Sequence, residues 1–214
     1  MSENPAVSAL NKAYQEYTEG DSTLTYLLGI IVAAVFLLEV AFTAITSLDS
    51  IQILATGIFG VHPVIAWPFS PVLHRGFPHF AANLVGLLAV GIPMEKHWNR
   101  KRYSLFLVVT GYLTIMAGTG FMWIFSESPL AFYGTSGVVY ALAGYSLIHL
   151  FRSHQQFNWS EKVAALIGFL ALVSVVVDPF TGPYFEPSWI NAGHASGFVI
   201  GAVSGWFGWG GKCA

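Results

Sequence analysis

Long apolar runs separated by short polar stretches dominate the pattern of this sequence. A helix that spans a bilayer needs about 20 mostly apolar residues. Six runs bounded by charged or turn-forming residues approach this length: 25–48, 79–94, 103–125, 136–150, 163–177 and 189–208. The pattern therefore predicts six membrane-spanning helices, with no segment left over for a soluble domain.

A further uncharged stretch, 50–74, does not fit a spanning helix. It contains five helix-breaking residues: Gly57, Gly60, Pro63, Pro68 and Pro71. A single proline costs roughly 3 kcal/mol inside a helix, so we expect a loop embedded in the membrane face. The chain then divides into a polar tail (1–24), a six-helix domain (25–208) and a short tail (209–214). Residues 1–24 lack the basic start and apolar core of a signal peptide.

Composition and charge support a membrane protein. Hydrophobic residues make up 55% of the 214 residues and charged ones only 9%, whereas a soluble domain carries roughly 25% charged residues. The net charge of −2 includes no basic block, so nucleic acid is not an expected partner. If the N-terminus is cytoplasmic and the chain crosses the membrane six times, eight of the nine Lys and Arg lie on the cytoplasmic side, and only Arg75 lies outside. This bias predicts a multi-pass protein of the cell membrane with both termini cytoplasmic.

Ser136 is the first candidate for chemistry. It follows Gly134 in a turn directly before an apolar helix, which places it at a helix N-terminus. The unpaired N–H groups there favour a developing negative charge, as on an oxyanion. The same position also suits an N-cap or a small residue that packs between helices.

His194 is the second candidate, and it lies beside a ladder of small residues in the last run. The ladder is Gly193, Gly197, Gly201 and Gly205, and the Ser136 run offers Gly137, Ala141 and Gly144. Small residues four apart let two helices approach closely. We therefore expect Ser136 and His194 to come within reach as a catalytic pair without a carboxylate, although a histidine bonded to a carbonyl is the alternative.

Three further polar residues fall on faces that point to the same site. His79 and Asn83 are four apart and share one helix face, where both can donate hydrogen bonds to an oxyanion or act as polar glue between helices. Tyr140 lies one turn after Ser136 and can stack on His194 or serve in ordinary aromatic packing. No His-Glu-x-x-His run is present, so the sequence predicts neither a metal site nor a cofactor.

These motifs resemble the rhomboid family of intramembrane serine proteases over most of the chain. The matching segments are 134–145 (GTSGVVYALAGY), 193–197 (GHASG) and His74 followed by His79 and Asn83. The resemblance implies Ser136 as nucleophile, His194 as general base and Tyr140 as its packing partner. It also implies an oxyanion hole formed by His79, Asn83 and the backbone N–H groups of Thr135 and Ser136. Glu95 matches a glutamate that ends the second span in that family.

The expected function is peptide-bond cleavage in the transmembrane segments of membrane proteins, in a water-filled cavity open to the outer face and reached laterally from the bilayer. Helical substrates hide their carbonyls, so segments with glycine or other helix-weakening residues are the expected targets. A rhomboid-like binding protein without catalysis is the alternative. A transporter dependent on Glu39 fits less well, because ion paths need more intramembrane charge. The oligomeric state is left open.

Overall fold

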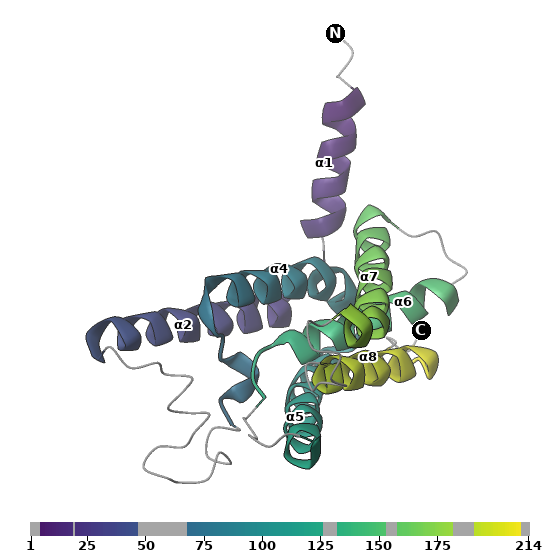
Figure 1. Ribbon diagram of the computed structural model, residues 1–214. Coiled ribbons are helices and arrows are strands. Elements are labelled where there is room, and N and C mark those ends of the chain that lie inside the picture. Colours follow the sequence, from purple (N-terminus) through teal and green to yellow (C-terminus); the bar gives the residue numbers. More distant parts are fainter. Residues whose placement is uncertain are drawn as a thin grey trace.

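The chain is all-helical wherever the computed structural model describes it, in residues 5–18, 20–46, 68–125, 132–152, 158–181 and 191–210. The elements are α1 (Pro5–Thr18), α2 (Thr23–Thr46), the short 3-10 helix η3 (Ser70–Val72), α4 (Gly76–Glu95), α5 (Arg100–Phe125), α6 (Ser136–Arg152), α7 (Trp159–Thr181) and α8 (Asn191–Trp206). Figure 1 shows α2 and α4 side by side, and α6 contacts α4, α5, α7 and α8. The predicted all-α membrane fold is confirmed.

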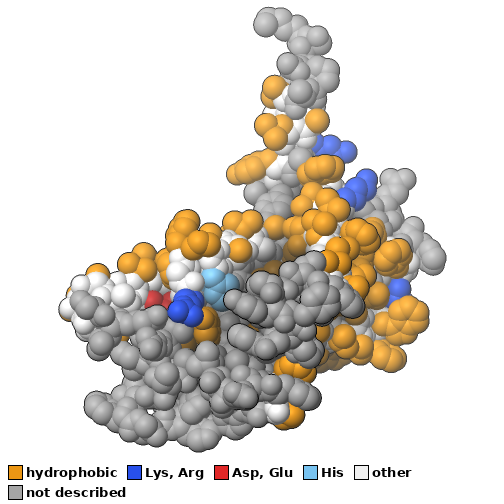
Figure 2. Space-filling view, in the orientation of Figure 1, with side chains coloured by type: hydrophobic (Ala, Val, Ile, Leu, Met, Phe, Trp, Pro, Cys, Tyr) orange, Lys and Arg blue, Asp and Glu red, His pale blue; other side chains and the backbone are white. Residues whose placement is uncertain are grey.

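Six of these helices coincide with the six predicted runs. Four of them are long and apolar enough to cross a membrane: Thr23–Thr46, Gly76–Glu95, Arg100–Phe121 and Trp159–Val177. Helices α6 and α8 are shorter, with 17 and 16 residues, so their crossing of the membrane stays a prediction. Figure 2 shows hydrophobic side chains over much of the described surface on this face, with few charged ones, as expected of a surface that meets lipid.

The N-terminal tail and the predicted embedded loop are two segments that lie outside these six helices. The polar tail contains a 14-residue helix, α1, which the pattern of apolar runs did not predict. It extends away from the other helices (Figure 1) and contacts α7. The predicted embedded loop lies mostly outside the described residues, and only its last part, with η3, can be described.

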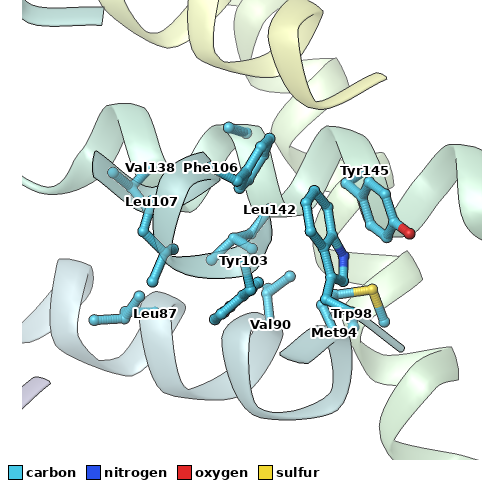
Figure 3. Close-up of a cluster of buried hydrophobic side chains, with 12 residues drawn as sticks. Leu87, Val90, Met94, Trp98, Tyr103, Phe106, Leu107, Val138, Leu142 and Tyr145 are labelled. Atoms are coloured by element: carbon cyan, nitrogen blue, oxygen red, sulfur yellow. The ribbon is translucent and has the colours of Figure 1, made fainter. Parts of the chain in front are cut away.

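A buried aromatic and aliphatic cluster joins α4, α5, α6 and the start of α7 (Figure 3). It consists of Leu87, Val90, Met94, Trp98, Tyr103, Phe106, Leu107, Val138, Ala141, Leu142, Tyr145 and Ala164. The Trp98 ring lies 4.7 Å, centroid to centroid, from the rings of both Phe106 and Tyr145. Aromatic side chains of α5 and α6 thus pack around one indole, which fixes the helix that carries Ser136 against its neighbour.

Two buried glutamates accept hydrogen bonds from backbone N–H groups of other elements. The Glu95 carboxylate accepts the N–H groups of Leu24 and Thr25 at 2.9 and 2.8 Å, so it caps the N-terminus of α2 from the end of α4. Glu39 of α2 accepts the N–H of His74, with its two oxygens 3.3 and 3.2 Å away. The contact gives Glu39 a structural function, positioning the segment just before α4.

Candidate active site

Ser136 is the first residue of α6 and only 8% exposed. The turn before it requires glycine, because Gly134 has a φ of +113°. That turn is held to the η3 segment by two hydrogen bonds, from Gly134 N–H to Ser70 O at 2.8 Å and from Thr135 Oγ1 to Pro71 O at 2.8 Å. The fold therefore fixes the start of α6, and with it the position of the Ser136 hydroxyl.

The backbones of α6 and α8 are in direct contact. A Cβ added at Gly197 would overlap the carbonyl oxygen of Gly137, and one at Gly201 would overlap that of Ala141. On the facing helix, a Cβ at Gly144 would overlap the carbonyl oxygen of Phe198. Close approach of this kind is possible only with small residues.

These contacts also set the relative direction of the two helices. Position 137 meets 197, and 141 meets 201, so the residue numbers rise together and the helices run parallel. Ser136 precedes the first contact by one residue, and His194 precedes it by three. Both side chains therefore lie at the same end of the helix pair.

The His194 imidazole is held by aromatic rings. The Tyr140 ring stacks on it with a centroid distance of 4.2 Å and an interplanar angle of 6°, and Phe132 meets it edge-on at 6.5 Å. The Tyr140 hydroxyl shares a hydrogen bond of 2.6 Å with Ser174 Oγ of α7. His194 Nδ1 is buried and has no hydrogen-bond partner in the part of the chain that the structure describes. Among the residues that the structure describes, the imidazole is therefore oriented by aromatic stacking and not by a carboxylate on Nδ1.

His79 of α4 lies beside the turn that leads to Ser136, and Asn83 follows it one turn later on the same helix. A Cβ at Gly134 would stand 2.9 Å from His79 Cε1, so the imidazole packs directly on that turn. Asn83 is 5% exposed and donates from Nδ2 to the carbonyl oxygen of His79 at 2.9 Å. An amide nitrogen carries two hydrogens, so the second N–H of Asn83 is left for another acceptor.

Thr135 N–H lies near an acceptor of the protein itself. It lies 3.5 Å from His74 Nε2, while His74 Nδ1 lies 3.0 Å from Val72 O. A carbonyl only accepts, so Nδ1 carries the hydrogen and Nε2 is the acceptor. Burial, aided by the nearby His79, lowers the pKa of His74 to about 4, which keeps the ring neutral near pH 7. Thr135 N–H therefore has an acceptor in this structure, and its part in an oxyanion hole stays a prediction.

A cavity of about 310 Å³ lies between α2, the 68–72 segment, α5 and α6. Its lining is almost entirely apolar and includes Thr135 and Val138 but neither Ser136 nor His194. It differs in both respects from the water-filled cavity expected over the catalytic pair, which stays a prediction.

Comparison with known proteins gives a consistent result. A family model described as Rhomboid domain matches residues 62–211, which contain every candidate site residue. The chain is 29% identical over 135 residues to the rhomboid protease GlpG of Haemophilus influenzae, covering 63% of this chain and 64% of that protein. It is also 29% identical over 134 residues to RHOMBOID-like protein 4 of Arabidopsis thaliana, covering 61% of this chain and 32% of that protein.

A GlpG from Salmonella paratyphi A is 27% identical over 150 residues, with 64% of this chain and 50% of the relative covered. The matched part of the chain thus spans between about a third and two thirds of the length of these curated relatives. Together with the apolar helices, the comparisons identify a multi-pass membrane protein with relatives named as proteases.

Proposed function

The chain belongs to the rhomboid family, and from that premise we propose that it is an intramembrane serine endopeptidase in which Ser136 and His194 form the catalytic pair. The observation that carries this proposal is the parallel, glycine-mediated contact of α6 and α8. It brings a serine at a helix start and a stacked histidine to the same end of two touching helices.

In the proposed reaction, His194 removes the proton of the Ser136 hydroxyl while Oγ attacks a peptide carbonyl. Collapse of the tetrahedral intermediate breaks the C–N bond, and His194 returns the proton to the leaving amine. Water, deprotonated by His194, then hydrolyses the acyl-enzyme and restores the serine. The stacked Tyr140 ring limits rotation of the imidazole, a function that a carboxylate performs in a triad.

The oxyanion is stabilised in this proposal by donors from two helices. The proposed donors are the N–H of Ser136 at the start of α6, the imidazole of His79, which packs on the turn before Ser136, and the second amide hydrogen of Asn83, one turn further along α4. Thr135 becomes a donor only if its N–H turns away from His74 Nε2.

The proposed substrates are single-span membrane proteins whose segments unwind readily near the outer face, because a carbonyl must leave its helical hydrogen bond to be attacked. We also propose that both termini are cytoplasmic and that residues 25–208 form the protease domain between two short tails. Reconstituted in liposomes with single-span reporters that carry glycine near the outer end, the protein is expected to release a soluble fragment. No release by folded protein from any such reporter would contradict the proposal.

Substitution of Asn83 by Ala is expected to lower kcat by up to roughly 10²-fold, at the low end for a lost oxyanion donor. Asn83→Asp is the matched control, because it keeps the size but removes the amide donors, and it is expected to be slowed as well. Reporter cleavage under saturating conditions measures the effect. Unchanged turnover in Asn83→Ala would exclude Asn83 as an oxyanion donor and leave it a packing contact between helices.

Substitutions at Tyr140 separate ring stacking from hydrogen bonding. Aromatic stacking is worth about 0.5–1.5 kcal/mol, and each ~1.4 kcal/mol corresponds to tenfold in rate. Tyr140→Ala is therefore expected to be slower by about twofold to tenfold. Tyr140→Phe keeps the ring on His194 and loses only the Ser174 contact, so its turnover should stay near that of the wild type. Equal turnover of both variants, measured by reporter cleavage, would argue against an orienting function of the ring.

A further inference from the structure

Three potential metal ligands meet at the end of α6 that is remote from Ser136. His97 lies in the turn after α4, His149 in the last turn of α6, and Glu161 in the first turn of α7. Each offers one ligand atom, and the three atoms lie within 4.8 Å of one another. His97 Nε2 contacts Glu161 Oε1, and the two imidazole centroids are 4.7 Å apart. We propose that these residues bind a divalent transition-metal ion, with Zn²⁺ as the natural occupant.

The carboxylate of this cluster is fixed in place by its own helix. Glu161 Oε2 accepts the N–H of Asn158 at 2.8 Å, and Asn158 Oδ1 accepts the N–H of Glu161 at 2.9 Å. This reciprocal pair is a capping box at the start of α7. It holds one carboxylate oxygen and directs the other, Oε1, toward His97. Such hydrogen bonds behind a ligand orient it for a metal.

The donor set selects the class of ion. Two imidazole nitrogens and one carboxylate oxygen suit Zn²⁺, which takes three protein ligands and a water in open sites. Mg²⁺ and Ca²⁺ prefer all-oxygen sites. Ligand atoms around a tetrahedral Zn²⁺ lie roughly 3.3–3.5 Å apart for bonds of about 2.0–2.1 Å. Binding therefore requires small shifts of the side chains, in which His97 Nε2 and Glu161 Oε1, now in direct contact, move apart to admit the ion. The His97 side chain is 32% exposed, which allows both this movement and access by the ion.

The site is distinct from the proposed catalytic pair. Thirteen positions of α6 separate Ser136 from His149, which corresponds to about 20 Å along a helix. An ion at this distance cannot polarise the carbonyl attacked by Ser136. It would instead join the turn after α4 to the ends of α6 and α7, and so brace three helices at one end of the bundle.

The test uses the full chain, purified in detergent without a histidine tag and stripped of metal by a chelator. Titration with Co²⁺ is expected to give a visible absorption spectrum that saturates at one ion per chain and is abolished by Zn²⁺, with a rise in Tm on binding. His97→Gln, His149→Gln and Glu161→Gln should each weaken Co²⁺ binding by about 10²-fold or more, since even residues behind a ligand cost 10–100-fold. The glutamine at position 161 keeps an acceptor for Asn158 N–H.

His194→Ala is the matched control, because it removes a histidine of α8 that lies near the start of α6, remote from the cluster, and should bind Co²⁺ as the wild type does. The proposal is overturned if no Co²⁺ spectrum develops, or if the three cluster variants bind with wild-type affinity. The cluster would then be two imidazoles in ring contact, one of them paired with a capping carboxylate. Neither result depends on whether the protein is a protease.

Discussion

Replacing Ser136 by Ala is expected to abolish cleavage of a membrane-embedded reporter while the protein stays folded. The substitution removes only the Oγ that attacks the peptide carbonyl, and loss of a serine nucleophile costs on the order of 10⁴-fold or more in related mechanisms. The start of α6 should survive, because Thr135 O accepts from Val138 and Val139 N–H and Thr135 Oγ1 is bonded to Pro71 O.

Ser146→Ala is the matched control for this prediction. Ser146 lies on the same helix and bonds the carbonyl oxygens of Ala143 and Ala164 at 2.8 and 2.9 Å. Its loss should cost about 1 kcal/mol of stability and leave cleavage in place. The measurement is fragment release from the reporter in liposomes, with Tm as the folding check. Cleavage by Ser136→Ala at the wild-type rate would exclude Ser136 as the nucleophile.

The second large effect is expected for Gly201→Ala. A helical Gly→Ala change normally stabilises by roughly 0.5–1 kcal/mol, but here the new methyl would overlap the carbonyl oxygen of Ala141. A backbone atom cannot turn aside as a side chain can, so α6 and α8 must separate. Overpacking costs typically 1–3 kcal/mol, occasionally more, and we expect the upper end of that range. Because Ser136 and His194 lie on the separating helices, cleavage should be lost as well.

Gly120→Ala controls for the chemical change itself. Gly120 of α5 has nothing within 4 Å of an added Cβ, so its substitution should leave Tm and cleavage unchanged or raise Tm slightly. Thermal unfolding in detergent, followed by reporter cleavage, compares the two variants. A Gly201→Ala protein as stable and active as Gly120→Ala would contradict the proposed close contact of α6 and α8.

Most helix boundaries could be predicted from the sequence because charges and turn residues mark them. The run 103–125 is observed as Arg100–Phe125, and 189–208 as Asn191–Trp206. Helix α1 was not predicted, since its polar composition does not match the apolar pattern of a span. It has instead three exposed apolar side chains at helical spacing, Val7, Leu10 and Tyr14. This periodicity is typical of an amphipathic helix and is the sequence signal for α1.

The contacts between residues far apart in the sequence could not be predicted, because no local sequence pattern indicates them. Glu39 was conspicuous as a charge in an apolar run, but nothing nearby in the sequence pointed to His74 N–H as its donor. Likewise, nothing near Thr135 in the sequence pointed to His74 Nε2 as an acceptor for its N–H. The cluster of His97, His149 and Glu161 was missed for the same reason, because its members come from three elements and no metal motif in the sequence links them.

The central claim is that Ser136 is an activated nucleophile dependent on His194, and a fluorophosphonate probe tests it without knowledge of the substrate. Purified wild-type protein in detergent should be labelled covalently, whereas Ser136→Ala and His194→Ala, shown to be folded by their Tm, should not. Absence of labelling in folded wild type, with a second, smaller serine probe also failing to react, would contradict the claim and favour a rhomboid-like binding protein without catalysis.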